Sequence, residues 1–128
     1  WAQACMSIPN LGTTHSDYWD IDIPVTRSLT KNEIVNEYEY NTGLVLSELI
    51  SKHSKCALSF PGALVRHHGP FTWGVDSKAA LKNAKLLEYV AKLAFQTLQL
   101  NQNSNIDEKI VKKHFERKNG PNAYYGQN

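Results

Sequence analysis

Residues 63–74 read Ala63-Leu64-Val65-Arg66-His67-His68-Gly69-Pro70-Phe71-Thr72-Trp73-Gly74, and the rest of the chain can be arranged around them. The apolar start is typical of a short β-strand, and Gly69-Pro70 predicts a turn directly after the two histidines. A strand end fixes the direction of an imidazole, so His68 is a candidate metal ligand. A zinc site needs three or four protein ligands, however, and the sequence offers no second pair with suitable spacing. The segment is half of a metal site or, as the residues alone favour, a polar strand end bonded to its own turn.

The clearest helix is predicted directly after this segment, from caps at Asp76 and Ser77 to about Leu100. Its apolar positions recur with helical spacing and predict one buried face. They are Ala80, Leu81, Ala84, Leu87, Val90, Ala91, Ala94 and Leu98. A final helix is predicted over about 107–118, with Asn105 and Glu108 as a capping pair and Gly120-Pro121 as the stop.

Upstream, Thr30 and Glu33 form a capping box that predicts a helix start. We expect Ile34, Tyr38 and Val35 on its inner face and a break at Asn41-Thr42-Gly43, followed by a second amphipathic stretch at 44–50.

The segment 20–26 alternates polar and apolar residues like a half-buried strand, and Pro24 predicts an edge or irregular position for it. Residues 57–65 predict one or two short strands interrupted by Pro61-Gly62, and residues 1–6 suggest the tail of a helix. Mixed strands and helices predict an α/β or α+β class.

The composition is that of one ordinary domain. The chain has 128 residues, 41% hydrophobic and 20% charged, and a net charge of +2. Basic and acidic residues are interspersed, which argues against a nucleic-acid patch, and no apolar run approaches the roughly 20 residues that span a bilayer. Cys5 and Cys56 form neither a CxxC pair nor a disulfide framework, so a reduced, cytosolic setting is expected.

Three further places carry groups suited to proton transfer, and the first two have a simpler interpretation. His15 and Asp17 lie in a Thr-Thr-His-Ser-Asp-Tyr cluster that a capped turn would also explain. His114 falls mid-helix among charged residues, as surface positions do. Tyr124-Tyr125 is unusual in a terminal tail, and a phenol placed in a site can serve as an acid.

Taken together and in order, these motifs closely resemble the epimerase branch of the class II aldolase/adducin family. They are Trp1-Ala2-Gln3-Ala4, Gly12-Thr13-Thr14-His15-Ser16-Asp17-Tyr18, Glu37-Tyr38-Glu39 with Thr42-Gly43, His68-Gly69-Pro70-Phe71-Thr72-Trp73-Gly74 and Asn122-Ala123-Tyr124-Tyr125-Gly126-Gln127. The resemblance implies a three-layer α/β/α sandwich of which residues 1–128 form the C-terminal portion of a single domain. In the family, a His-Thr-His motif with two zinc ligands and the Gly- and Ser-rich phosphate loops lie upstream of the position of Trp1. This chain alone is therefore expected to be inactive.

The resemblance also implies an activity and its residues. The family branch is a zinc-dependent isomerase of carbohydrate metabolism and arabinose catabolism, a cytoplasmic homotetramer with sites between subunits and one Zn²⁺ per subunit. It interconverts L-ribulose 5-phosphate and D-xylulose 5-phosphate by retro-aldol/aldol chemistry at C3–C4. By this resemblance His68 is the third zinc ligand, and Asp17 and Tyr125 are the acid/base pair, with Tyr125 reaching an adjacent subunit. His114 and Glu39 fall near the subunit interface and the aspartate.

One departure and three alternatives stay open. Arg66-His67-His68 replaces the more usual His-Ser-His, and strand alternation places the Arg66 cation on the side of His68, where it would oppose a metal. The alternatives are a sugar-phosphate aldolase of the same family, a non-catalytic adducin-like interaction module, and a degenerate pseudoenzyme.

Overall fold

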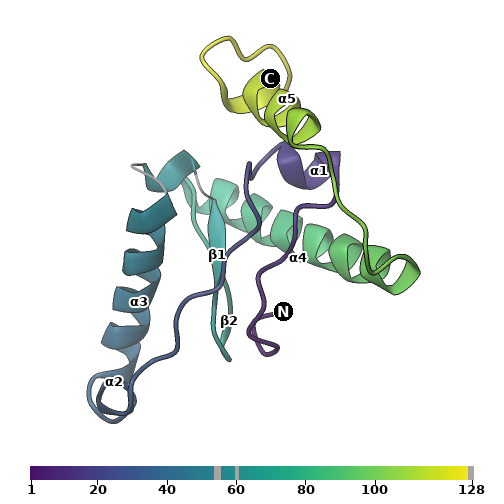
Figure 1. Ribbon diagram of the computed structural model, residues 1–128. Helices are drawn as coiled ribbons and strands as arrows, with labels where there is room; N and C mark the ends of the chain where they lie inside the picture. Colours follow the sequence, from purple (N-terminus) through teal and green to yellow (C-terminus); the bar gives the residue numbers. More distant parts are fainter. Residues whose placement is uncertain (54–55, 60, 127–128) are drawn as a thin grey trace.

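The computed structural model describes residues 1–53, 56–59 and 61–126, and a β-hairpin lies at its centre (Figure 1). Strand β1 (Gly62–Val65) pairs antiparallel with β2 (Gly69–Thr72), so residues 66–68 form the turn. The turn predicted at Gly69-Pro70 is therefore wrong, because these two residues begin β2. The strand expected within 57–65 is confirmed only from Gly62, because Ala57–Ser59 forms a 3₁₀ turn, η1. All four residues of β1 are buried, whereas β2 is partly exposed.

Backbone bridges extend the hairpin towards the N-terminus. Ile8 pairs antiparallel with Ile23, and Val25 pairs parallel with Leu64. The extended segment predicted at 20–26 thus exists, but it lies between two partners instead of at an edge. It forms isolated bridges, as the irregular position of Pro24 requires.

The tryptophan indole of Trp19 compensates for this proline. If the parallel pairing of Val25 with Leu64 continued, the N–H of residue 24 would donate to the Gly62 carbonyl. Residue 24 is a proline, which has no N–H to donate. The Trp19 Nε1–H donates to that carbonyl instead, at 3.1 Å. Trp19 is 1% exposed, so the buried carbonyl is satisfied from within the core.

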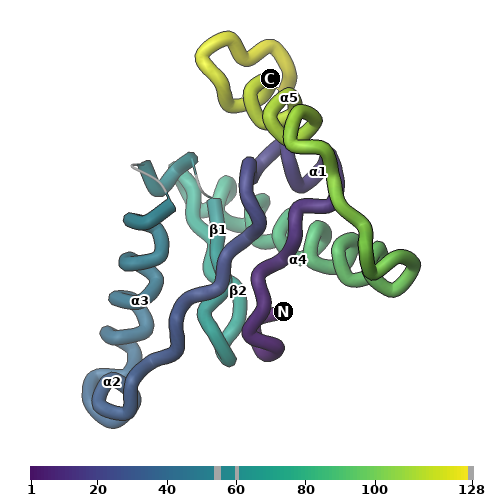
Figure 2. Tube along the Cα trace, viewed as in Figure 1, coloured from purple at the N-terminus to yellow at the C-terminus, as the bar shows by residue number. Residues whose placement is uncertain are grey.

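Two long helices cover the hairpin (Figures 1 and 2). Helix α3 (Tyr38–His53) packs beside β1, and α4 (Ser77–Leu100) contacts both strands. The bounds of α4 agree with the sequence, and Asp76 caps it by accepting the Ala79 N–H at 2.7 Å. Leu81 and Ala84, assigned to its inner face, are exposed instead. The buried core combines the two helices with the bridged segments, and its members are Ala2, Ile8, Trp19, Ile23, Leu49, Ala63, Leu64, Leu87, Val90 and Ala94.

The predicted capping box at Thr30 is confirmed, but the helix after it is short. Helix α2 (Lys31–Val35) has five residues and ends before Glu37, whose φ is +50°. The break expected at 41–43 is therefore wrong, because α3 runs through these residues. Asn41 holds the corner by donating to the Asn36 carbonyl at 2.7 Å. The inner face predicted for Ile34, Val35 and Tyr38 is also wrong, since all three are exposed.

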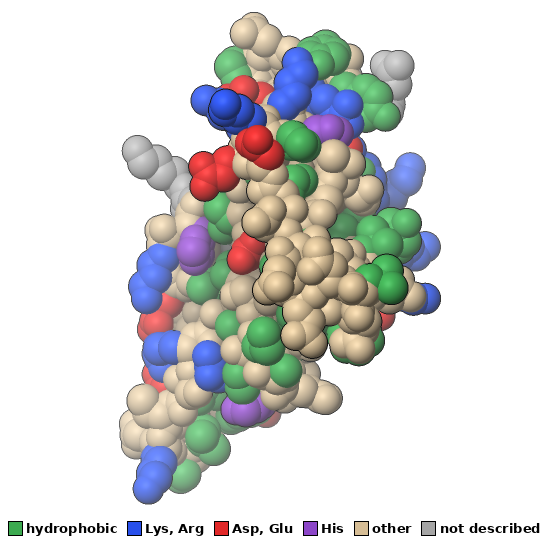
Figure 3. Space-filling model, turned by 45° about the vertical axis from the view of Figure 1, so that its right-hand side comes forward, with side chains coloured by type: hydrophobic (Ala, Val, Ile, Leu, Met, Phe, Trp, Pro, Cys, Tyr) green, Lys and Arg blue, Asp and Glu red, His purple; other side chains and the backbone are tan. Residues whose placement is uncertain are grey.

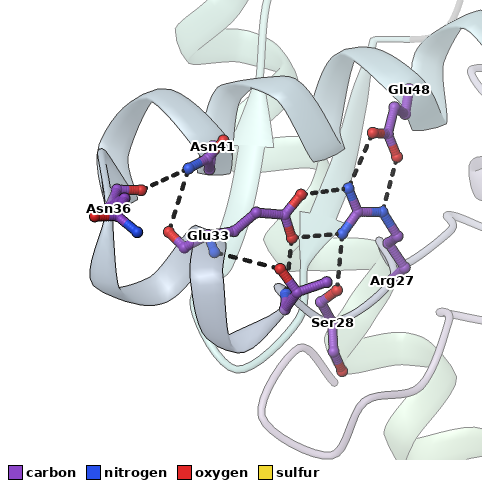
Figure 4. A network of polar contacts seen from close by, with 7 residues as sticks. Arg27, Ser28, Glu33, Asn36, Asn41 and Glu48 are labelled. Atoms are coloured by element: carbon purple, nitrogen blue, oxygen red, sulfur yellow. Dashed lines mark hydrogen bonds and ion pairs between the residues drawn. The ribbon is translucent and has the colours of Figure 1, made fainter.

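A charged network fixes α2 against α3 (Figure 4). The Arg27 guanidinium donates to Glu33 at 2.8 and 2.9 Å and to Glu48 at 2.9 and 3.0 Å. These hydrogen bonds lower the pKa of Glu33 to about 2 and raise that of Arg27. Arg27 and Glu48 are exposed to solvent and Glu33 is partly exposed, so the network contributes more to geometry than to stability.

The remaining elements lie at the two ends of the chain. Residues 2–5 form a tight turn where a helix tail was expected. Helix α1 (Thr13–Ser16) is one short turn, and α5 (Glu108–Asn119) packs on it. The N-cap of α5 is Asp107 and not Asn105, while Gly120 ends the helix as predicted. In the part of the chain that the structure describes, no helix has the length and apolar character needed to cross a bilayer.

Two glycine-to-alanine changes test this packing. A Cβ on Gly62 would lie 2.9 Å from the Thr72 side chain, whereas Gly43, within α3, has open space around it. We expect Gly62→Ala to destabilise the fold by about 1–3 kcal/mol through overpacking. Gly43→Ala should stabilise it by about 0.5–1 kcal/mol through helix propensity. Urea denaturation measures both, and equal effects of the two variants would contradict the packing around β1.

Candidate functional site

Asp17 lies at the C-terminal end of α1 and binds two side chains of α5. Its Oδ1 accepts from His114 Nδ1 at 2.9 Å and from Arg117 Nη2 at 3.1 Å, while Oδ2 accepts from Arg117 Nη2 at 3.3 Å. His114 and Arg117 are three residues apart and therefore share one helix face. The side chains of the three residues are only 14–22% exposed. The Asn119 side chain also donates to the Asp17 carbonyl at 2.9 Å.

Arg117 connects this carboxylate to Tyr125. Its guanidinium carbon lies 4.1 Å from the centre of the Tyr125 ring, within the range of a cation–π contact. The Tyr124 and Tyr125 N–H groups both donate to the Arg117 carbonyl, so the tail folds back onto α5. The structure thus brings the two predicted acid/base residues against one guanidinium, whose N–H groups bond Asp17 while its face packs on the Tyr125 ring.

His15 anchors the segment that carries Asp17. The imidazole is 4% exposed, its Nε2–H donates to the Ile21 carbonyl at 3.1 Å, and its ring meets Trp19 edge-on. Burial disfavours the charged imidazolium and lowers the pKa of His15 to about 4. His15 is therefore a neutral core histidine that stabilises the loop around Asp17, whereas the simpler interpretation expected a capped turn and α1 has no side-chain cap.

The other predicted site residue, His68, lies at the opposite end of the molecule. It occupies the exposed turn of the hairpin beside the N-terminal turn, whereas α1 and α5 lie at the far end (Figure 1). Its ring packs on Phe71 with a centroid separation of 5.5 Å. Within one chain, His68 is therefore separated from the Asp17 cluster.

Arg66 does not take the orientation that strand alternation suggested. Residues 66–68 belong to the turn, where His67 has φ of +60°, so the alternation ends at Val65. The Arg66 Nε–H donates to the Thr26 carbonyl at 3.2 Å, which directs the guanidinium towards the neighbouring segment.

The described residues do not form a complete metal site. Among residues 1–53, 56–59 and 61–126, no group of three or more His, Cys, Asp or Glu side chains is placed to hold an ion. His68 is one candidate ligand, so this chain's described residues do not by themselves fit a zinc centre.

The sequence predicted roles for Asp17 and Tyr125 but not the contacts of Arg117 with both residues or of Asn119 with Asp17. The spacing of His114 and Arg117 on one predicted helix was a usable signal. Glu39 lies in the exposed first turn of α3, outside the cluster. Charged side chains of both signs gather at the α5 end of the surface (Figure 3).

The chain is similar in sequence to known proteins over nearly its whole length. Residues 1–95 match the sequence model described as Class II Aldolase and Adducin N-terminal domain, which has an α/β fold. Over 128 residues the chain is 51% identical to the L-ribulose-5-phosphate 4-epimerase UlaF of Salmonella paratyphi C (strain RKS4594) and of Salmonella choleraesuis (strain SC-B67). The UlaF of Salmonella paratyphi A (strain ATCC 9150 / SARB42) is 50% identical. Each alignment covers 99% of this chain and 55% of the relative, so the chain spans about half the length of these relatives.

The buried His15 predicts a specific dependence of stability on pH. The unfolded chain protonates this histidine near pH 6.5 and the folded chain only near pH 4. Between these values the unfolded state binds the extra proton, so stability falls as the pH falls. We expect a loss of about 2 kcal/mol between pH 7.5 and pH 5, measured by urea denaturation. His15→Phe should lack this component and His67→Asn should keep it; the same pH dependence in wild type and His15→Phe would contradict the assignment.

Proposed function

The chain belongs to the class II aldolase and adducin family, and we propose that it is the C-terminal portion of a single-domain sugar-phosphate epimerase. The proposed reaction interconverts L-ribulose 5-phosphate and D-xylulose 5-phosphate. The observation that carries the proposal is that Arg117 contacts both Asp17 and Tyr125. The chain is also 51% identical to a protein named as this epimerase. Because the chain covers 55% of those relatives, the activity is proposed for the longer protein.

The chemistry explains why an acid/base pair is needed. The hydrogen on C4 is not acidic, so simple deprotonation cannot invert that carbon. In a retro-aldol route, a base removes the C4 hydroxyl proton, the O–H electrons form the aldehyde, and the C3–C4 bond breaks to leave an enediolate. The aldehyde rotates, the enediolate attacks its other face, and an acid protonates the new C4 alkoxide. The two proton-transfer groups must therefore stand on opposite faces of the substrate.

Asp17 and Tyr125 fit these two roles. Asp17 Oδ1 accepts hydrogen bonds from both His114 and Arg117, whereas Oδ2 has one longer contact and retains capacity for a substrate proton. Tyr125 is half exposed and its phenol supplies the second proton-transfer group. A carboxylate and a phenol differ by about six pKa units in water, so the bound substrate must reduce that gap.

In this proposal His68 is one ligand of a zinc ion whose other ligands lie upstream of Trp1. A bound zinc ion supplies positive charge that stabilises the enediolate oxygens. The separation of His68 from both Asp17 and Tyr125 within one chain supports a site assembled between subunits of a homotetramer, in which Asp17 and Tyr125 of one copy serve the His68 end of a neighbouring copy.

One observation favours a second candidate, a non-catalytic adducin-like module. The described residues contain one predicted zinc ligand and no group of three that could hold an ion. A chain that never acquired further ligands would keep the fold without the reaction.

Conservative variants test the acid/base pair. In the natural polypeptide that carries this sequence, Tyr125→Phe and Asp17→Asn should each lower epimerase kcat by about 10²–10⁴-fold, because each removes one proton-transfer group. Zinc content should not change. Tyr124→Phe is the matched control. Tyr124 is the neighbouring residue and its ring contacts Lys113 instead of Arg117, so this variant should keep full turnover. An unchanged kcat in Tyr125→Phe would contradict the proposed role of Tyr125 in proton transfer.

Zinc retention tests the half-site interpretation. We expect the 128-residue chain to retain no stoichiometric zinc after gel filtration and to show no turnover, because one histidine cannot hold the ion. A chain of the length of the relatives should retain one zinc per subunit and epimerise L-ribulose 5-phosphate. Metal analysis and a coupled assay give both readings. The absence of zinc and turnover in both folded chains would favour the interaction module.

A further inference from the structure

Lys118, the residue after Arg117 on α5, contacts both the end of α1 and the C-terminal tail. Its Nζ lies 3.8 Å from the centre of the Tyr18 ring, within the range of a cation–π contact. Its side chain also lies beside Gly126, where an added Cβ would come within 3.1 Å of Lys118 Cε. The ammonium group therefore meets the residue that follows Asp17, and the stem of the same side chain meets the tail.

We propose that Lys118 is a positioning residue, which holds the Tyr125 phenol in place relative to the Asp17 carboxylate. This inference rests on the proposed function, in which these two groups transfer protons. Arg117 joins Asp17 to Tyr125, and Lys118 joins the next residue of each segment. Because neighbouring positions of a helix point about 100° apart, the two bridges restrain the tail in different directions.

The tail backbone shows why a second bridge is needed. The Tyr124 and Tyr125 N–H groups both donate to one acceptor, the Arg117 carbonyl, at 2.9 and 3.1 Å. Gly126 has φ of +70°, so the chain enters the left-handed region directly after Tyr125. Glycine adopts this conformation without strain and leaves room for the Lys118 stem. The tail thus reaches its position through one shared acceptor and a left-handed turn beside Lys118.

A second helix holds the Tyr18 ring that Lys118 contacts. The Nζ of Lys82, on α4, lies 5.6 Å from the centre of this ring, so cations from two helices share one aromatic ring. Tyr18 is partly buried, and its ring lies 6.4 Å from that of Trp19, a member of the core. Lys118 therefore attaches α5 and the tail to a ring that the core already fixes.

Epimerase kinetics of the natural polypeptide test this role. Lys118→Ala should lower kcat about tenfold and change KM less than about threefold, because it misplaces a proton-transfer group without removing a substrate contact. Lys118→Arg keeps a cation and a long stem and should restore most of kcat. Tyr18→Phe keeps the ring face and should match the wild type, whereas Tyr18→Leu should resemble Lys118→Ala. Lys113→Ala is the matched control, since it removes the cation over the Tyr124 ring and should leave kcat unchanged.

Hydrogen exchange measures the position of the tail without any turnover. The N–H groups of Tyr124 and Tyr125 are protected only while the tail is bonded to the Arg117 carbonyl, so mass spectrometry of their exchange reports that bonding. Lys118→Ala and Tyr18→Leu should speed this exchange about fivefold or more, while the amides of α4 exchange as in the wild type.

The results for Lys118→Ala separate this proposal from the proposed reaction. Unchanged exchange of the tail would overturn the proposal, and so would an unchanged kcat in an active enzyme. Faster exchange in a natural polypeptide without epimerase activity would keep Lys118 as the residue that holds the tail and would contradict the proposed function instead. A kcat as low in Tyr18→Phe as in Tyr18→Leu would assign the effect to the hydroxyl and overturn the role of the ring contact.

Discussion

The hydrogen bond from the Trp19 indole to the Gly62 carbonyl joins the two halves of this structure. Pro24 brings the bridged segment alongside β1 but cannot donate to that carbonyl, and Trp19 makes the missing bond from inside the core. An unpaired carbonyl at a buried strand would cost about 1–3 kcal/mol. The same tryptophan packs against His15, so a single side chain connects the hairpin to the helix that positions Asp17.

The cluster of Asp17, His114 and Arg117 depends on that connection, because local sequence alone places none of its members. Asp17 comes from a helix of four residues, too short to be stable by itself. His114 and Arg117 come from α5, about a hundred residues later, and meet Asp17 only because α5 packs on α1. Arg117 also contacts the Tyr125 ring, so one guanidinium joins a carboxylate and a phenol.

The hairpin turn, at the far end of the molecule, carries His67 and His68. His68 faces one side of the turn and lines a shallow pocket of about 250 Å³, while His67 meets Cys5 away from that pocket. Arg66, which was expected to oppose a cation here, instead donates to the Thr26 carbonyl. The two ends of the molecule therefore carry different side chains: a hydrogen-bonded carboxylate, imidazole and guanidinium at α1–α5, and two exposed imidazoles at the turn.

The sequence by itself determined the elements whose signals are local. The capping box at Thr30, the cap at Asp76 and the stop at Gly120 each depend on side chains within four residues, and all three were predictable. Local sequence placed the turn at Gly69-Pro70, whereas the hairpin turns at residues 66–68, which include His68. Tertiary structure alone decided which apolar residues are buried and where the helices break. Ile34 and Val35 have helical spacing but are exposed. The helix break lies at residues 36–37 and not at the predicted 41–43, and the Asn41 side chain bonds the Asn36 carbonyl there. The contacts Asp17–Arg117, Trp19–Gly62 and Cys5–His67 join residues 43 to 100 positions apart, and no local pattern encodes such distances.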